Sequence, residues 1–140
     1  MVVPRFLLDT NAISEPVRPR PSDVFLSRFR QHQSSLCTCA IVWHEAWYGV
    51  SVLPVGARRR LIEEFLQVVL RGMPILPYDD RAARWHGEER ARLRHLGRPT
   101  SFADGQIAAV AVVNDRTLVT SNTADFTSFA GLKVVDWTLP

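Results

Sequence analysis

The sequence predicts an α/β fold of three layers, in which a central, mainly parallel sheet of five strands lies between two layers of helices. Short apolar stretches alternate with longer ones in which apolar residues recur every three or four positions, as in amphipathic helices. Parallel strands need long crossovers, and helices are the usual crossovers. The chain has 140 residues, 46% of them hydrophobic, which suits one such domain over residues 1–140.

The strands and helices can be placed in order along the chain. The predicted strands span residues 6–8, 35–39, 73–78, 117–120 and 132–137. The predicted helices span residues 11–17, 23–33, 41–53, 57–70, 80–96 and 102–114, with a short helix between the last two strands. Ser22 and Asp79 are suited to cap the helices that follow them, and Gly97 is suited to end one.

Asp9 is unusual, because it stands at the end of the apolar strand 6–8. A strand this apolar should be covered on both faces, where an uncompensated charge is costly. A metal ion, backbone donors of the next helix or a basic partner could each compensate the charge.

Three further acidic residues are predicted to meet Asp9 at the carboxyl edge of the sheet. Glu45 lies in the helix after the second strand, Asp104 begins the helix before the fourth strand, and Asp125 follows the fourth strand. This edge is where doubly wound sheets bind ligands. Taken singly, Asp104 and Asp125 could be helix caps and Glu45 a solvent-exposed helix residue. Together they resist that explanation, because Glu45 and Asp104 lie among apolar or small residues.

A group of four carboxylates calls for a cation. Two carboxylates about 4 Å apart repel each other by roughly 4 kcal/mol at an effective dielectric constant near 20. Oxygen ligands select hard ions, which predicts one or two Mg²⁺ or Mn²⁺ ions, and no His or Cys falls at the spacing of a zinc site. His44 and Glu45 resemble the start of a zinc-protease helix, but Tyr48 stands where the second His belongs.

Polar residues flank the four acids and are expected to orient the ligands or to hold metal-bound water. They are Thr10, Asn11, Ser101, Ser121 and Asn122. Thr10 and Asn11 could equally be a simple helix start.

The charge distribution suits a protein that receives a polyanion. The net charge is +3, from 17 basic and 14 acidic residues. Setting the four clustered acids aside leaves ten acidic against 17 basic residues, a basic surplus of seven. Arginine-rich helices that merely keep the chain soluble would explain the same numbers. An acidic site for magnesium-type ions in a basic body is the equipment for cutting a phosphodiester bond, and no Ser-His-Asp arrangement or glycine-rich phosphate loop competes for that role.

The compartment is suggested by what the sequence does not contain. The longest uninterrupted apolar run, residues 107–113, is far shorter than a membrane-spanning helix, and Pro4, Arg5 and Asp9 interrupt any signal-peptide pattern. A soluble cytoplasmic protein is expected. Cys37 and Cys39 stand two apart in a strand, so they should be buried thiols rather than a disulfide or a zinc site.

These motifs resemble those of VapC-type PIN-domain ribonucleases, the toxins of type II (VapBC) toxin-antitoxin systems. The resemblance spans essentially the whole chain and rests on Leu7-Leu8-Asp9-Thr10-Asn11 with Ile13-Ser14-Glu15, the Glu45 helix with Gly49, the Asp104 helix with Ile107-Ala108-Ala109 and Ala111, residues 120–126, and residues 131–137. It implies that Asp9, Glu45, Asp104 and Asp125 bind one or two Mg²⁺ or Mn²⁺ ions, with Asn122 assisting, and that metal-activated water cleaves RNA. Ser121 departs from the pattern, because relatives often carry Arg there.

The resemblance also implies a homodimer and an inhibitory VapB-like antitoxin that lies in a groove formed by helices 41–53 and 57–70. The large side chains that favour this groove, and that could equally be core, are Trp43, Trp47, Tyr48, Val50 and Phe65. Two arginine groups are candidate RNA contacts, namely Arg58, Arg59 and Arg60 in one helix and Arg90, Arg92 and Arg94 in another.

Two other functions remain open. A receiver-type metal-binding regulator also uses acids at strand ends, and Asp79 and Asp80 follow the third strand, but the only Lys, Lys133, begins the fifth strand. A catalytically inactive PIN-fold module that binds nucleic acid or protein would not need all four acids. Hydrolysis by metal-activated water needs no 2′-hydroxyl, so the preference for RNA over DNA comes from the resemblance alone.

Overall fold

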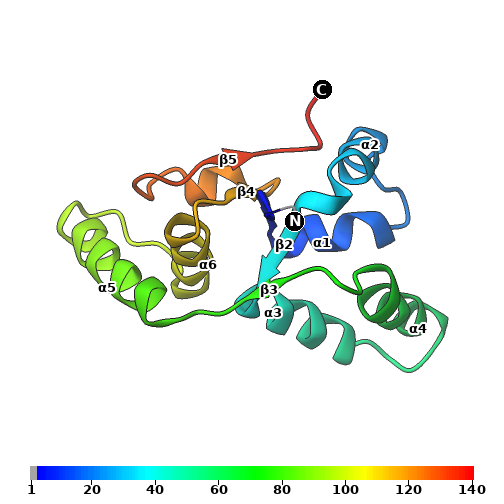
Figure 1. The fold of residues 1–140 in the computed structure, drawn as a ribbon. Helices are drawn as coiled ribbons and strands as arrows, with labels where there is room; N and C mark the ends of the chain where they lie inside the picture. The colour runs from blue at the N-terminus through cyan, green and yellow to red at the C-terminus, as the bar shows by residue number, and fades with distance from the viewer. Residues whose placement is uncertain (1–2) are drawn as a thin grey trace.

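A five-stranded sheet in which all neighbouring strands are parallel forms the centre of the computed structural model, which describes residues 3–140 (Figure 1). The strands are β1 Phe6–Leu8, β2 Leu36–Cys39, β3 Ile75–Leu76, β4 Thr117–Val119 and β5 Val134–Val135. Their order is β3-β2-β1-β4-β5, so the direction of strand addition reverses between β1 and β4. The predicted α/β sheet is confirmed, and the reversal creates the crevice where such sheets bind ligands.

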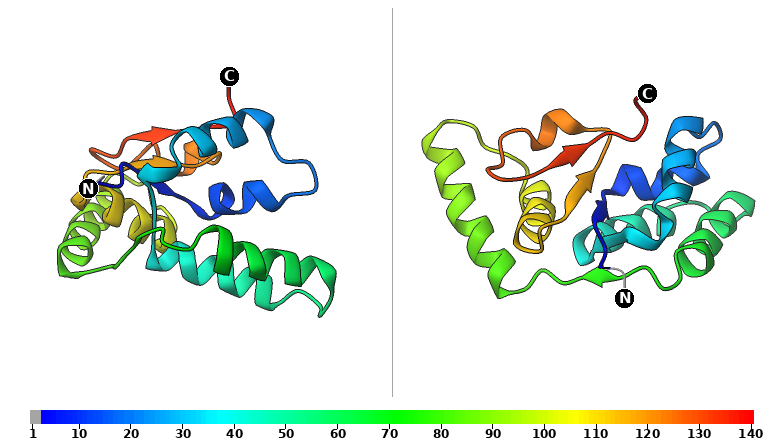
Figure 2. Two further views of the ribbon diagram at one scale, coloured as in Figure 1. Left: turned by 45° about the vertical axis from the view of Figure 1, so that its right-hand side comes forward. Right: turned by 45° about the horizontal axis from the view of Figure 1, so that its top comes forward.

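Helices cover both faces of the sheet. They are α1 Thr10–Ser14, η1 Glu15–Val17, α2 Asp23–Gln31, η2 Gln33–Ser35, α3 Ala40–Ser51, α4 Ala57–Glu64, η3 Phe65–Val69, α5 Asp80–His95, α6 Phe102–Val113 and η4 Thr123–Phe126. Figure 1 shows α1, α2 and α4 on one side of the sheet and α5, α6 and η4 on the other. In all three views α4 and α5 lie at opposite ends of the molecule (Figures 1 and 2). No helix within residues 3–140 combines the length and apolar character needed to cross a membrane.

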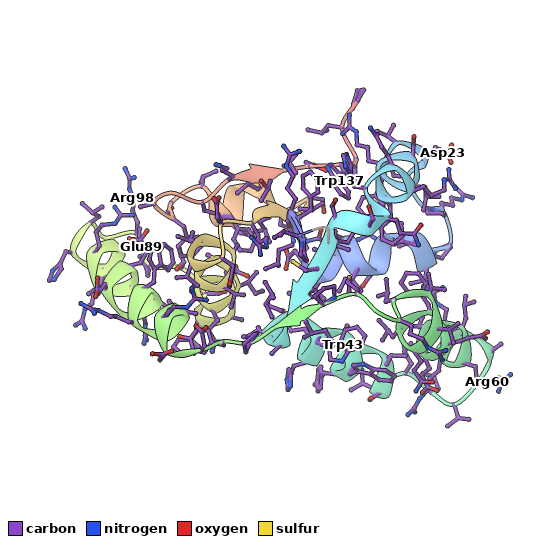
Figure 3. The ribbon with its side chains drawn as sticks, in the orientation of Figure 1. Asp23, Trp43, Arg60, Glu89, Arg98 and Trp137 are labelled. Atoms are coloured by element: carbon purple, nitrogen blue, oxygen red, sulfur yellow. The ribbon has the colours of Figure 1, made fainter. Side chains whose placement is uncertain are left out.

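The central strands are apolar throughout because helices cover both of their faces. Leu7 and Leu8 of β1 have no exposed surface. At one edge of the core Trp137 closes the space between β5 and α2, with its ring 5.0 Å from that of Phe6 (Figure 3). Cys37 and Cys39 are buried free thiols, as predicted, and burial raises the pKa of each to about 11.

The prediction of one regular helix over residues 57–70 was wrong at its end. The chain changes there from α4 to the π-helical turn η3, and the backbone N–H of Leu70 donates to the carbonyl of Phe65 at 3.2 Å, five residues back. A π-helical turn contains one residue more than an α-helical turn, so the side chains after it point in different directions from those of a regular helix. Val69 is 50% exposed, while Phe65 and Leu70 are buried.

Other predicted boundaries were also too long or displaced. The predicted strands 73–78 and 132–137 pair over only two residues each, because both lie at an edge of the sheet and Pro74 and Pro77 flank β3. The predicted helix 11–17 becomes 3₁₀ from Glu15 onward, next to Pro16. Helix 23–33 ends at Gln31, helix 41–53 is Ala40–Ser51, and strand 35–39 begins at Leu36.

Candidate active site

Asp9 lies at the junction of β1 and α1, and its charge is held by polar groups rather than by a basic residue. The side chain is almost fully buried, with 6% of the residue exposed. Its Oδ2 accepts hydrogen bonds from Thr120 Oγ1 at 2.8 Å and from Asn11 Nδ2 at 3.1 Å. Burial nevertheless raises the pKa of Asp9, the negative charge of Glu45 adds to the increase, and the hydrogen bonds oppose it.

Thr120, at the end of β4, connects this carboxylate to the following loop. Its Oγ1 accepts from Asn11 Nδ2 at 3.0 Å and from the backbone N–H of Asn122 at 3.1 Å while donating to Asp9. Asn11 Oδ1 in turn accepts from the backbone N–H of Ser121 at 2.9 Å. All hydrogen-bonding positions of the Thr120 hydroxyl are therefore used. Thr120 is not among the site residues predicted from the sequence, although a hydroxyl at the end of an apolar strand was the available signal.

Glu45 lies on α3 and is held by Thr10. The Thr10 hydroxyl donates to Glu45 Oε1 at 2.9 Å, which joins the first turn of α1 to α3. Both residues line a cleft of about 730 Å³ between α3 and α6, where Tyr48 and Gln106 form part of the wall. Glu45 is thus reached from solvent through this cleft.

Asp104 and Asp125 complete the acidic group from the opposite side of the sheet. Asp104 is in the first turn of α6, where its backbone N–H donates to Ser101 Oγ at 3.0 Å, so Ser101 acts as the cap of this helix. Asp125 is exposed in η4, and its backbone N–H donates to the carbonyl of Asn122 at 3.1 Å. Burial raises the pKa of Asp104, and the charges of Asp9 and Asp125 raise it further.

The four carboxylates therefore lie close enough for their charges to act on one another in pairs: Asp9 with Glu45, Asp9 with Asp104, and Asp104 with Asp125. Within residues 3–140 no three Asp, Glu, His or Cys side chains converge into a ready-made metal cluster. Mutual repulsion is a physical reason for carboxylates to stay apart without a cation. The donor set fits a hard divalent ion, because it consists of carboxylate and hydroxyl oxygens.

Comparison with known proteins identifies the family of the chain. Residues 6–132 match the model of the PIN domain family. The chain belongs to the PIN domain family.

Individual PIN-domain relatives are similar over nearly their whole length. The "tRNA(fMet)-specific endonuclease VapC" of Shigella flexneri is 32% identical over 134 residues, which cover 95% of this chain and 98% of that protein. The "Toxin FitB" of Neisseria gonorrhoeae is 32% identical, covering 86% of this chain and 89% of that one. Among solved structures, that of FitAcB from Neisseria gonorrhoeae has a TM-score of 0.86 at 32% identity and covers 94% and 97% of the two chains.

The two predicted arginine groups of this PIN domain lie far apart. Figure 3 shows Arg60 of α4 at the end of the molecule opposite Glu89 of α5. In the α4 group, Arg58 donates to the carbonyl of Val17 and Arg59 pairs with Glu63 at 2.7 Å. In the α5 group, Arg92 binds the buried Glu89 through two hydrogen bonds, of 2.6 and 2.8 Å. These three arginines are thus already engaged with the protein.

The large side chains proposed for an antitoxin groove divide into two sets. Val50 and Phe65 belong to the hydrophobic core, with 2% and 8% exposure, so for these two residues the core is the correct one of the two alternatives. Trp43 and Trp47 contact each other edge to face at 6.1 Å and are half-buried. Tyr48 is 65% exposed at the wall of the cleft. The first set is part of the core because α3, which carries Val50, packs against α4 as well as against β2 and β3, and Phe65 belongs to the same cluster of buried side chains.

Proposed function

We propose that this PIN domain is an endoribonuclease toxin that hydrolyses RNA phosphodiester bonds with Mg²⁺ or Mn²⁺ held by Asp9, Glu45, Asp104 and Asp125. The observation that supports the proposal is that the charges of these acids, which come from the end of β1 and from α3, α6 and η4, act on one another in pairs, and that Glu45 borders an open cleft. Relatives at 30% identity or more that carry the name of ribonuclease or endonuclease support this activity.

The residues around the acids fix their orientation before an ion binds. When bound, one or two divalent ions supply positive charge and Lewis acidity toward water and a phosphate oxygen. Thr120 and Asn11 hold Asp9 from one side, and Thr10 holds Glu45. Ser101 fixes the backbone of the turn that carries Asp104. Such contacts behind metal ligands contribute about 10- to 100-fold to metal affinity or activity.

Ser121 and Asn122 have a different place in this proposal. Both side chains are exposed, and the contacts that join them to the acidic group come from their backbone N–H and carbonyl groups. We assign them to shaping the loop between Thr120 and Asp125, from which the side chain of Asn122 can assist a bound ion.

A VapB-like antitoxin is the inhibitor that we propose for this chain. The solved relatives include "FitAB bound to IR36 DNA fragment" and DNA-bound VapBC from Salmonella typhimurium, with TM-scores of 0.86 and 0.84. Exposed apolar residues gather on α3, α4 and the segments that follow them, where an antitoxin segment could cover them: Tyr48, Val52, Val55, Leu61, Val68 and Val69. We also propose that the chain forms a homodimer and acts in the cytoplasm.

The receiver-type alternative has little support in the structure. Asp79 Oδ1 accepts from the backbone N–H of Ala82 at 3.0 Å, and that hydrogen bond lowers the pKa of Asp79, so this acid caps α5. Lys133 lies 3.9 Å from Asp115, where both side chains are exposed. An inactive binding module remains the competing proposal, and activity separates the two.

Cleavage of RNA in the presence and absence of metal tests the proposal. We expect the protein to cut single-stranded RNA in Mg²⁺ or Mn²⁺, to stop in chelator and to recover when metal is restored. Asp104→Asn should lower the rate by more than about 100-fold, since even residues behind metal ligands contribute up to that factor. The matched control is Asp80→Asn, because Asp80 is also an acid in the first turn of a helix but is exposed on α5.

Two outcomes would contradict the proposal. Cleavage that persists unchanged in chelator would remove the role of a metal. An Asp104→Asn protein as active as Asp80→Asn would remove Asp104 from the site. An intact far-ultraviolet circular dichroism spectrum of both variants shows that the comparison concerns the site and not the fold.

A further inference from the structure

A basic hollow of about 910 Å³ lies along the C-terminal half of α5 and the segment that leads to α6. Arg90, Arg94 and His95 contribute from α5, and Pro99 and Thr100 contribute from the connecting segment. Among the described residues, 3–140, no acidic residue lines the hollow. Arg90 and Arg94 are four residues apart and therefore lie on the same side of the helix.

The charge of this hollow is not neutralised by the protein. Other arginines of α5 have acidic partners: Arg81 pairs with Asp79 at 3.3 Å, Arg84 with Glu88 at 2.8 Å and Arg92 with Glu89 at 2.6 Å. Within residues 3–140 neither Arg90 nor Arg94 has a carboxylate within salt-bridge distance. These two guanidinium groups remain available for an anion.

Phe102 connects the hollow to the acidic group. It is the first residue of α6 and is 53% exposed, although aromatic side chains of this size are usually covered. The Arg90 guanidinium lies 5.1 Å from the centre of its ring, and the buried ring of His86 supports it at 5.0 Å. Asp104 is in the same first turn of α6.

We propose that Phe102, Arg90 and Arg94 form a subsite for single-stranded RNA that flanks the phosphate to be cut. The inference rests on the proposed function and names where the substrate extends beyond the acids. A base stacks on the exposed part of Phe102, and the two arginines bind the backbone phosphates that follow it into the hollow. A base within a duplex has both of its faces stacked on neighbours, so the subsite selects unpaired segments.

Two double substitutions and one single substitution test the subsite, and one of the double substitutions is a charge-matched control. Arg90→Ser with Arg94→Ser removes the two charges of the hollow. Arg20→Ser with Arg30→Ser removes two charges elsewhere, since Arg20 precedes α2 and Arg30 lies in α2, both are exposed, and within residues 3–140 neither has a carboxylate within salt-bridge distance. Phe102→Leu keeps an apolar side chain but removes the aromatic face.

The measurements are kcat and KM with a single-stranded oligoribonucleotide at several salt concentrations, together with its binding in chelator. For the Arg90/Arg94 variant we expect KM to rise about 10-fold or more with kcat unchanged, and the salt dependence of binding to flatten by about 0.7 per lost phosphate contact. Phe102→Leu should raise KM about 10-fold without changing the salt dependence. The control pair should change KM less than the Arg90/Arg94 pair does.

The outcomes separate this inference from the proposed function. Cleavage with unchanged KM in the Arg90/Arg94 and Phe102 variants would refute the subsite and leave the nuclease intact. Wild-type protein that binds RNA through these residues but cuts none would refute the nuclease and keep the subsite. Equal effects of the two arginine pairs would show that only the net charge of the protein matters for RNA binding, which would overturn the subsite. A changed sedimentation coefficient of Phe102→Leu would assign this face to contact between copies of the chain, which also overturns it.

Discussion

At the scale of single residues, Thr120 decides how Asp9 is presented. Its hydroxyl donates to Asp9 Oδ2 at 2.8 Å and thereby lowers the pKa of that carboxyl. Thr120→Val keeps the shape of the side chain but removes this donor. We expect the pKa of Asp9 to rise further and the affinity for Mg²⁺ to fall about 10- to 100-fold. Titration of the cleavage rate with Mg²⁺ measures the loss.

Thr38 provides the control for this substitution. It is also a buried threonine, in β2, and its hydroxyl donates to the backbone carbonyl of Leu8 at 2.8 Å rather than to a carboxylate. Thr38→Val should cost about 1 kcal/mol of unfolding free energy, as loss of a hydrogen bond does, and leave the Mg²⁺ dependence unchanged. Equal Mg²⁺ affinities in the two variants would show that Thr120 does not position Asp9.

The contrast between Asp9 and Thr120 explains what the sequence could reveal about the site. A buried carboxylate without a compensating partner costs free energy, so the acids could be predicted as site residues from the sequence alone. A threonine in an apolar stretch carries no charge that must be compensated. Its contact with Asp9 depends on the pairing of β4 with β1, which the sequence does not reveal. The same limit applies to Val50 and Phe65, because an apolar residue on a helix can face a core or a partner until the packing is known.

At the scale of elements, α5 and α6 approach each other closely at one glycine. A Cβ atom added at Gly105 would lie 2.2 Å from Nε2 of His86, a buried residue whose Nδ1 is 3.0 Å from the hydroxyl of Tyr78. Gly105→Ala should therefore destabilise the fold by about 1 to 3 kcal/mol, the usual range for overpacking. Because Asp104 precedes this glycine, we also expect the variant to lose cleavage activity. Urea denaturation measures the first effect.

Gly87 of α5 is a glycine whose replacement by alanine should stabilise the fold instead. Within residues 3–140, no atom lies within 4 Å of a Cβ added there. Gly87→Ala should stabilise the protein by about 0.5 to 1 kcal/mol through the helix preference of alanine. Combining Gly105→Ala with His86→Ala should recover part of the lost stability, since the obstructing ring is removed. A Gly105→Ala protein as stable as the wild type would contradict the close contact.

Element order was predictable, whereas several element ends were not. Short apolar stretches indicated strands covered on both faces, and apolar residues every three or four positions indicated helices with one buried face. Their alternation along the chain predicted the parallel sheet. The turn η3 could not be foreseen from residues 57–70, since an extra residue in a helix depends on what the side chains of Phe65 and Leu70 must fill. The lengths of β3 and β5 depend on their position at the sheet edges, which only the strand order supplies.

At the scale of the whole molecule, the parallel sheet brings like charges together and leaves basic charge on the outside. The acids arrive from β1, α3, α6 and η4, which are far apart in the chain. The arginines of α4 and α5 lie at opposite ends of the molecule (Figures 1 and 3). The repulsion among the acids is an electrostatic cost of folding, which a bound cation would reduce.

That cost should appear as a dependence of stability on pH and metal. The pKa values of Asp9 and Asp104 are raised above the ordinary 3.8 in the folded protein, so between the ordinary and the raised values the folded protein binds protons that the unfolded chain has released. The contribution of these two groups to the unfolding free energy therefore falls as pH rises through that interval. Asp104→Asn removes one of the two charges, and in chelator its stability should exceed that of the wild type increasingly as pH rises.

Divalent metal should reverse this order. An ion that binds only the folded protein adds about 2.7 kcal/mol of stability at 100 times its Kd. Added Mg²⁺ at neutral pH should therefore stabilise the wild type more than Asp104→Asn, which has lost a ligand. Urea denaturation from pH 4 to 8, with chelator and with Mg²⁺, gives both comparisons. A constant stability difference between the two proteins at all pH values in chelator would show that Asp104 carries no charge conflict, and equal stabilisation by Mg²⁺ would show that the ion binds elsewhere.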